Sequence, residues 1–201
     1  MRQIILASAS PRRKELLGLL RVEFKIQPAV GEEVLTTTNP SDAVKELSAQ
    51  KAGEIAEHAV GHVLIIGADT VVSQDGEILG KPVSEQDAFD MIKKLQGNTH
   101  SVFTGVTVLE KTEEQEGYLR SITFAEETKV VVAPMSDKQI WDYVNLGESM
   151  DKAGAYGIQG IFGAFVERID GDYNNVVGLP VSRLYRELYA AGIDLLAKEN
   201  N

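Results

Sequence analysis

The sequence predicts an α/β protein with a long mixed sheet flanked by helices, folded as two lobes with a central cleft. Strand-like runs outnumber those of a simple β–α–β series, and some follow one another through hairpin signals such as the Asp-Gly pair at residues 75–76. Other strand-like runs are separated by helical patterns with one apolar face, as expected for helices that pack on a sheet. Residues 1–201, 43% of them hydrophobic, suffice for a single domain with its own core.

The first two predicted elements are a buried strand and a helix. Residues 4–6 form a short apolar run that is typical of such a strand, and the helical pattern that follows carries Leu16 and Leu17 on one face. Ser10 is predicted to cap this helix, and Pro11 suits its first position because that position needs no N–H donor. A strand is therefore expected to lead directly into a helix.

The turn into this helix has the residue types of a phosphate-binding site. Ser8 and Ser10 supply hydroxyl groups beside the positive end of the helix, which favours an anion. Arg12 and Arg13 add guanidinium donors. Cations in a first turn oppose the helix dipole, so a purely structural role leaves Arg12, Arg13 and Lys14 unexplained. An anionic ligand is expected here.

A short strand, a polar turn and a long helix are predicted next. The strand covers residues 22–26, and the turn carries two adjacent carboxylates, the second of which is Glu33. Ser41 is predicted to cap a helix that ends near His58. Lys51 lies in the middle of this helix, where a lysine on its own indicates a solvated side chain.

Residues 63–72 form the most apolar run of the chain and predict a central strand buried on both faces. A carboxylate in such a run is costly unless it binds a cation or accepts hydrogen bonds. Asp69 is therefore the strongest functional candidate, and the structural alternative is a carboxylate bonded to backbone amides. A hairpin at residues 75–76 leads to Lys81, which lies between a glycine and a proline on a stiff, extended backbone.

In the rest of the chain, predicted helices alternate with predicted β-hairpins. The stretch at residues 150–160 is too rich in glycine to lie inside a helix or a strand. The expected elements are a helix at 84–95 opened by a capping box, strands at 102–109 and 122–132 joined by a solvated loop at 110–117, a helix from Ser136 to about 147, a hairpin of strands at 161–169 and 173–177, and a last helix from 178 to about 191.

Composition excludes several classes of function. The net charge of −10 argues against binding to nucleic acid, whereas the first 25 residues carry six basic and two acidic side chains, a local charge of +4 that suits a small polyanion. Cysteine is absent and only three histidines occur, so a metal would be a hard cation held by carboxylates. No membrane span or signal peptide is recognisable, and a cytoplasmic protein is expected.

The motif S-x-S-P-R-R-x-E-L-L at residues 8–17 resembles the opening signature of the Maf proteins, nucleoside triphosphate pyrophosphatases first described through septum formation. Further segments resemble Maf motifs in the family's order, so that the resemblance covers nearly the whole chain. These segments are residues 32–33, 50–52, 67–70, 80–82, 151–160 and 178–180.

The resemblance implies a fold like that of the inosine triphosphate pyrophosphatases, usually a homodimer. It also implies hydrolysis of a nucleoside triphosphate to the monophosphate and pyrophosphate, assisted by Mg²⁺ or Mn²⁺. Glu33 and Asp69 would hold the metal, and Asp69 would accept a proton. The implied catalytic residues are Asp69, Glu33, Lys51 and Lys81, and the implied substrate-binding residues are Ser8, Ser10, Arg12, Arg13, Thr70 and Gln159.

Three positions indicate which nucleobase the substrate carries. Arg12, Thr70 and Gln159 resemble the family's dTTP/UTP subgroup, whereas the subgroup that takes 7-methyl-GTP tends to have tryptophan, glutamine and glutamate there. A neutral Gln159 amide can both donate to and accept from the edge of uracil or thymine. The resemblance thus predicts hydrolysis of dTTP and UTP, or of modified pyrimidine nucleotides. It also suggests a role in nucleotide pool cleansing and cell division arrest.

Two other classes of function share some of these sequence features. A nucleotidyltransferase also places a small-residue turn and basic residues after its first strand, but its turn is normally glycine-rich, and residues 1–17 contain no glycine. A nucleotide-binding regulator of division without catalysis would not need Glu33, Lys51, Asp69 and Lys81. Release of pyrophosphate from UTP in the presence of Mg²⁺ distinguishes a hydrolase from this regulator.

Overall fold

The structure is a computed structural model that describes residues 2–112 and 117–196. No helix in these two ranges is long and apolar enough to cross a membrane. The elements in chain order are β1 (Gln3–Leu6), α1 (Pro11–Gly18), β2 (Phe24–Ile26), α2 (Pro40–His58), β3 (Val63–Gln74), β4 (Glu77–Leu79), α3 (Glu85–Leu95), β5 (Thr99–Lys111), β6 (Arg120–Val132), α4 (Asp137–Val144), the 3₁₀ helices η1 (Ala153–Ala155) and η2 (Ile161–Phe165), β7 (Val166–Asp170), α5 (Tyr173–Val177) and α6 (Val181–Ala190).

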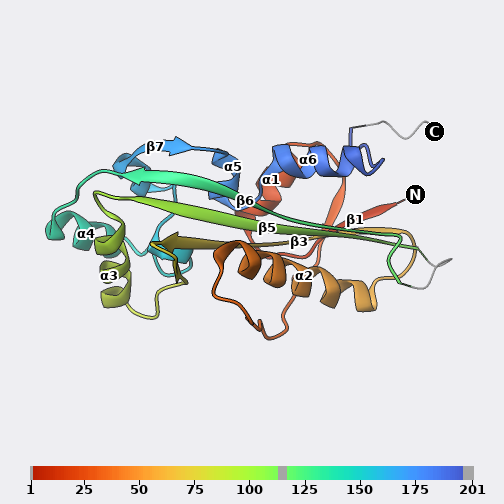
Figure 1. Cartoon of the computed structure of the whole chain (residues 1–201), viewed down its shortest axis with the longest axis horizontal. Coiled ribbons are helices and arrows are strands. Elements are labelled where there is room, and N and C mark those ends of the chain that lie inside the picture. The colour runs from red at the N-terminus through yellow and green to blue at the C-terminus, as the bar shows by residue number, and fades with distance from the viewer. Residues whose placement is uncertain (1, 113–116, 197–201) are drawn as a thin grey trace.

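One mixed sheet forms the framework, as predicted. Its strand order is β2-β1-β3-β5-β6-β7, and β4 pairs with the end of β3. β1 is parallel to β2 and β3, whereas β3, β5, β6 and β7 pair antiparallel. The long strands β3, β5 and β6 run through the length of the molecule, with α1 and α6 on one side and α2 on the other (Figure 1). The predicted α/β class and flanking helices are confirmed.

β3 is buried on both faces because successive side chains point to opposite sides of a strand. Leu64 and Ile66 pack in a cluster with residues of α1 and α6, whereas Val63 and Ile65 pack in a second cluster with residues of α2. A third cluster lies farther along the same long strands and includes residues of α3 and α4. Helices therefore gather at both ends of the shared strands (Figure 1).

The predicted serine caps are confirmed in three of the six α-helices of the described residues, α1, α3 and α4. Ser10 caps α1, with Pro11 at its start, and Ser136 forms the capping box of α4. The predicted cap of α2 was wrong: Asn39, not Ser41, caps this helix and accepts a hydrogen bond from the backbone N–H of Asp42 at 3.1 Å. The helix begins earlier because its first residue, a proline, already has a helical φ angle. Ser84 caps α3, but Asp87 accepts from Val83 instead of completing the capping box.

The predicted hairpin near the C-terminus was wrong. Residues 173–177 form α5 instead of a strand, and β7 pairs with β6. Asp172 caps α5 by accepting from the Asn174 N–H at 2.8 Å, and Thr128 on β6 bonds both the N–H and the C=O of Asp172. A contact with β6 thus selects a helix where the local pattern favoured a strand. The strands β5 and β6 are also longer than expected, and of the predicted loop at 110–117, residues 113–116 lie outside the described residues.

His100 on β5 gives a prediction about stability in acid. Its side chain is 2% exposed, its Nε2 lies 2.7 Å from the Tyr156 hydroxyl, and burial lowers its pKa to about 4. The unfolded chain, in which a histidine has a pKa of about 6.5, therefore binds a proton first as the pH falls. Stability should be complete above about pH 6.5 and should fall by about 3 kcal/mol as the pH drops to about 4.

Urea unfolding at pH 7 and pH 4.5 measures this loss. In His100→Gln the difference in the free energy of unfolding between the two pH values should shrink by about 2.5 kcal/mol, because the titrating group is gone. An unchanged difference would contradict the assignment to His100.

Candidate active site

The candidate active site lies where part of one edge of β3 has no neighbouring strand in the described part of the chain. We call this part of the edge the break in the sheet. On one edge of β3, β1 pairs with Val63–Ile66 and β4 pairs with Val72–Gln74, so that residues 67–71 have no strand partner on that edge among the described residues. Asp69 and Thr70 lie in this break. Because they are successive strand residues, their side chains point to opposite faces. Groups from both faces of the sheet can therefore meet at the break.

Two glycines bring α2 close to the sheet at this point. A Cβ atom on Gly67 of β3 would lie 2.4 Å from a carbonyl oxygen of α2, and one on Gly105 of β5 would lie 2.1 Å from another. Gly105 is the β5 partner of Asp69. The absence of side chains lets the helix backbone contact the strands, which places Lys51 of α2 beside Asp69.

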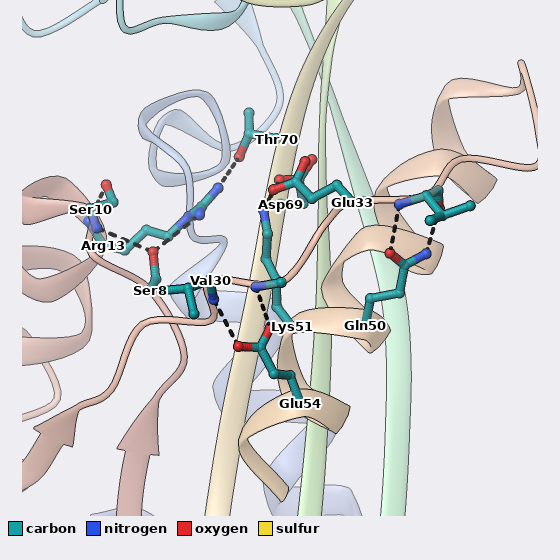
Figure 2. A network of polar contacts seen from close by, with 12 residues as sticks. Ser8, Ser10, Arg13, Val30, Glu33, Gln50, Lys51, Glu54, Asp69 and Thr70 are labelled. Atoms are coloured by element: carbon teal, nitrogen blue, oxygen red, sulfur yellow. Dashed lines mark hydrogen bonds and ion pairs between the residues drawn. The ribbon is translucent and has the colours of Figure 1, made fainter. Parts of the chain in front are cut away.

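Lys51 joins two carboxylates. Its Nζ donates to Asp69 Oδ1 at 2.5 Å and lies 2.9 Å from Glu33 Oε1 (Figure 2). The side chains of Lys51 and Asp69 are 16% and 13% exposed, whereas that of Glu33 is 52% exposed. The lysine is therefore not the solvated residue that its helical position suggested. Asp69 Oδ2 accepts no hydrogen bond from the described residues and is free to bind a ligand or water.

Arg13 is held at three points on the other side of the break. Its Nε donates to the Gly178 carbonyl at 2.9 Å. Its Nη1 donates to Ser8 Oγ at 3.3 Å and its Nη2 to Thr70 Oγ1 at 3.0 Å (Figure 2). Burial lowers the pKa of Arg13, and the charge of Asp69 opposes this shift. A guanidinium still remains protonated at neutral pH and has five N–H donors. Two of them make no hydrogen bond to a described residue and stay available for a ligand.

The contact between Arg13 and Thr70 belongs to a directed chain of hydrogen bonds. Thr104 on β5 donates its only hydroxyl hydrogen to the Asn175 carbonyl at 2.9 Å. Its oxygen must therefore accept from Thr70, 2.9 Å away, which leaves the Thr70 oxygen to accept from Arg13. Asn175 is in turn anchored to the Val102 carbonyl at 3.0 Å. This chain fixes the orientation of the guanidinium.

Three predicted site residues lie outside these contacts. Arg12 is 3.7 Å from Asp151 in the glycine-rich segment, and Gln159 of that segment is exposed and makes no polar contact with a described residue. Lys81 is exposed on the chain that follows β4, which runs antiparallel to β3 and returns toward Thr70. The structure thus joins Ser8, Ser10, Arg13 and Thr70 in one set of contacts and Glu33, Lys51 and Asp69 in another.

Sequence reasoning missed several residues that support the site. It assigned no role to Thr104 or Asn175, although both are buried polar side chains. It also overlooked Glu46 and Glu54, which contact the segment that carries Glu33. Their spacing of eight residues, with Gln50 midway, was a usable signal because it places all three on one helix face.

The donors at the break suit a divalent cation that also binds the substrate. No group of three or more histidine, aspartate and glutamate side chains converges in the described residues, so a complete protein cage is absent there. Mg²⁺ is usually held by one or two carboxylates together with substrate phosphates and water. Glu33 and Asp69, which converge on the same ammonium group, provide two such oxygen donors.

Comparison with known proteins identifies the family of the chain. The family model described as "Maf-like protein" matches residues 3–191. The chain belongs to the Maf family. A relative of this Maf protein from Agathobacter rectalis is named dTTP/UTP pyrophosphatase and is 48% identical, covering 97% of this chain and 100% of its own length. A relative with the same name from Lachnoclostridium phytofermentans is 46% identical and covers 98% of each chain.

Solved structures with partial similarity include the Ham1 protein of Staphylococcus aureus, with a TM-score of 0.43 and 12% identity over 65% of this chain and 72% of that one. A HAM1 protein from Coxiella burnetii has a TM-score of 0.44 and 16% identity over 67% of this chain and 75% of that one. The family recognition made from the motifs is confirmed. Cytoplasmic location, a homodimer and a role in division stay predictions.

Proposed function

We propose that this Maf protein hydrolyses dTTP and UTP to the nucleoside monophosphate and pyrophosphate. The observation that carries the proposal is the pairing of a held, cationic Arg13 with the Lys51–Asp69–Glu33 cluster at one break in the sheet. The names of two relatives that match nearly the full chain support the same activity and enzyme class.

The contacts that join Ser8, Ser10, Arg13 and Thr70 suit a triphosphate, which carries about four negative charges. Arg13 has two free N–H donors, and both serine hydroxyls accept hydrogen bonds within the protein, so that their hydrogens remain for phosphate oxygens. Arg12 and Lys81 add two further cations. Because Arg13 is already oriented, little reorganisation is needed when charge develops on the leaving pyrophosphate.

The contacts that join Glu33, Lys51 and Asp69 suit the reaction of the triphosphate with water. The water oxygen bonds to one of the two phosphorus atoms beside the α–β bridging oxygen, and the bond from that phosphorus to the bridging oxygen breaks. Attack at the α phosphorus expels pyrophosphate, attack at the β phosphorus expels the monophosphate, and both routes give the same two products. Asp69 accepts the proton of the water through Oδ2, while Lys51 holds Oδ1. A divalent cation, held by Glu33 and Asp69, would neutralise phosphate charge and make its bound water more acidic.

The base would be recognised at the glycine-rich segment. Gln159 is exposed there, and its neutral amide can pair with the edge of uracil or thymine. Arg12 is linked to the same segment through Asp151. The Thr70 hydroxyl hydrogen is used by Thr104, so Thr70 would influence the substrate through Arg13.

A substrate panel tests the proposal. The protein with Mg²⁺ is incubated with dTTP, UTP, CTP or 7-methyl-GTP, and pyrophosphate and monophosphate are measured. We expect the highest kcat/KM for dTTP and UTP, and a selective loss for both in Gln159→Glu. A preference for 7-methyl-GTP would contradict the assignment of the base but not of the reaction. No pyrophosphate from any nucleotide would contradict the activity.

A further inference from the structure

The segment that carries Glu33 has no regular secondary structure and little apolar burial to fix its position. Residues 30–36, which we call the strap, lie along α2 between β2 and the start of α2 and belong to no helix or strand. Val30 is 88% exposed and Val34 is 55% exposed, so apolar burial contributes little to the position of the strap. Other contacts must determine where the Glu33 carboxylate lies.

Three side chains of α2, the strap-binding side chains Glu46, Gln50 and Glu54, bind the strap backbone on both sides of Glu33. Their spacing of four residues places them on one face of the helix. Gln50 accepts from the Val34 N–H at 3.0 Å and donates to the Val34 carbonyl at 2.5 Å, which fixes both the place and the rotation of the residue next to Glu33 (Figure 2). The other bonds run from the N–H groups of Val30 and Gly31 to Glu54 at 2.8 and 3.0 Å, and from that of Thr36 to Glu46 at 3.0 Å.

Ionised carboxylates suit this task because they only accept hydrogen bonds. The backbone N–H groups of Val30 and Gly31 hold the pKa of Glu54 below its usual value. Glu54 therefore remains an acceptor for both amides at neutral pH. Gln50 differs from the two glutamates in that it binds one N–H and one C=O, and an amide is the side chain that can do both.

We propose that the three strap-binding side chains are positioning residues, which hold the Glu33 carboxylate against Lys51 at 2.9 Å. The inference rests on the proposed function, in which Glu33 helps to hold the cation and is useful only if it stays next to Asp69. A displacement of about 1 Å can lower turnover about 100-fold. Because the strap is exposed, its hydrogen bonds to α2 are the main contacts that prevent such a displacement.

A double-mutant cycle on kcat with dTTP tests the coupling. Gln50→Leu removes both bonds to Val34 and should lower kcat roughly 10- to 100-fold. In a Glu33→Gln background the same change should cost almost nothing, because the carboxylate that it positions is already gone. Glu54→Gln is the second variant if Gln50→Leu folds poorly. Glu57→Gln, an exposed change on the same helix, is the matched control and should leave kcat unchanged.

Amide hydrogen exchange of the strap gives a readout that does not require activity. Exchange of residues 30–36 should become faster in Gln50→Leu but not in Glu57→Gln. Unchanged exchange of the strap, or equal fractional losses of kcat with and without Glu33, would overturn the proposal. A wild-type protein that releases no pyrophosphate would contradict the proposed function instead, and the exchange result would still decide whether α2 holds the strap.

Discussion

Asp69→Asn should lower turnover by about 10²- to 10⁴-fold, the usual effect of removing a general base. The asparagine amide keeps an oxygen that can accept from Lys51, but it cannot take a proton from water or bind a cation as a carboxylate does. The fold should persist, because the two side chains are nearly isosteric and Lys51 retains its ion pair with Glu33. The contacts that position Arg13, the proposed phosphate ligand, are untouched, so substrate binding should survive.

Pyrophosphate release from dTTP and UTP measures the loss, and equilibrium binding of the nucleotide with thermal unfolding shows what is preserved. Asp137→Asn, which alters an exposed carboxylate paired with Lys93 at the start of α4, is the matched control and should retain full activity. An Asp69→Asn protein with most of the wild-type turnover would contradict the role of Asp69 as proton acceptor.

Gly105→Ala should destabilise the protein and displace Lys51 from Asp69. The added Cβ would lie 2.1 Å from the Val44 carbonyl oxygen, whereas such atoms normally stay about 3.5 Å apart. The obstacle is helix backbone, which cannot rotate away as a side chain could. We expect a loss of at least about 3 kcal/mol and a thermal midpoint lower by about 6 to 12 °C. Turnover should fall by about 100-fold, since α2 carries Lys51 outward.

Gly53→Ala is the control for this variant. Gly53 lies on α2, and an added Cβ there meets no atom within 4 Å. Replacing a glycine inside a helix by alanine stabilises by about 0.5–1 kcal/mol. A Gly105→Ala protein as stable as Gly53→Ala would show that α2 does not depend on close contact with β5.

The elements that could be predicted are those whose signals are local. The apolar run at residues 63–72 indicated a doubly buried strand, and the serine caps of α1 and α4 lie within three residues of the groups that they bond. The predicted strand at residues 173–177 is wrong because the local pattern there suits a strand as well as the helix that forms. Thr128, 44 residues away from Asp172, selects the helix there, and no local pattern contains that information.

The sequence by itself determined the family, the α/β class and the identities of the candidate site residues, because each of these depends on residue types at short spacing. The contacts among those residues were decided by the tertiary structure alone. Arg13 and Thr70 are 57 positions apart, and Lys51 and Asp69 are 18 apart. They meet because the pairing of β1 and β4 leaves part of β3 without a neighbour, and because two glycines let α2 contact the sheet beside that break. Such register and docking arise from packing between distant elements, which local propensities do not encode.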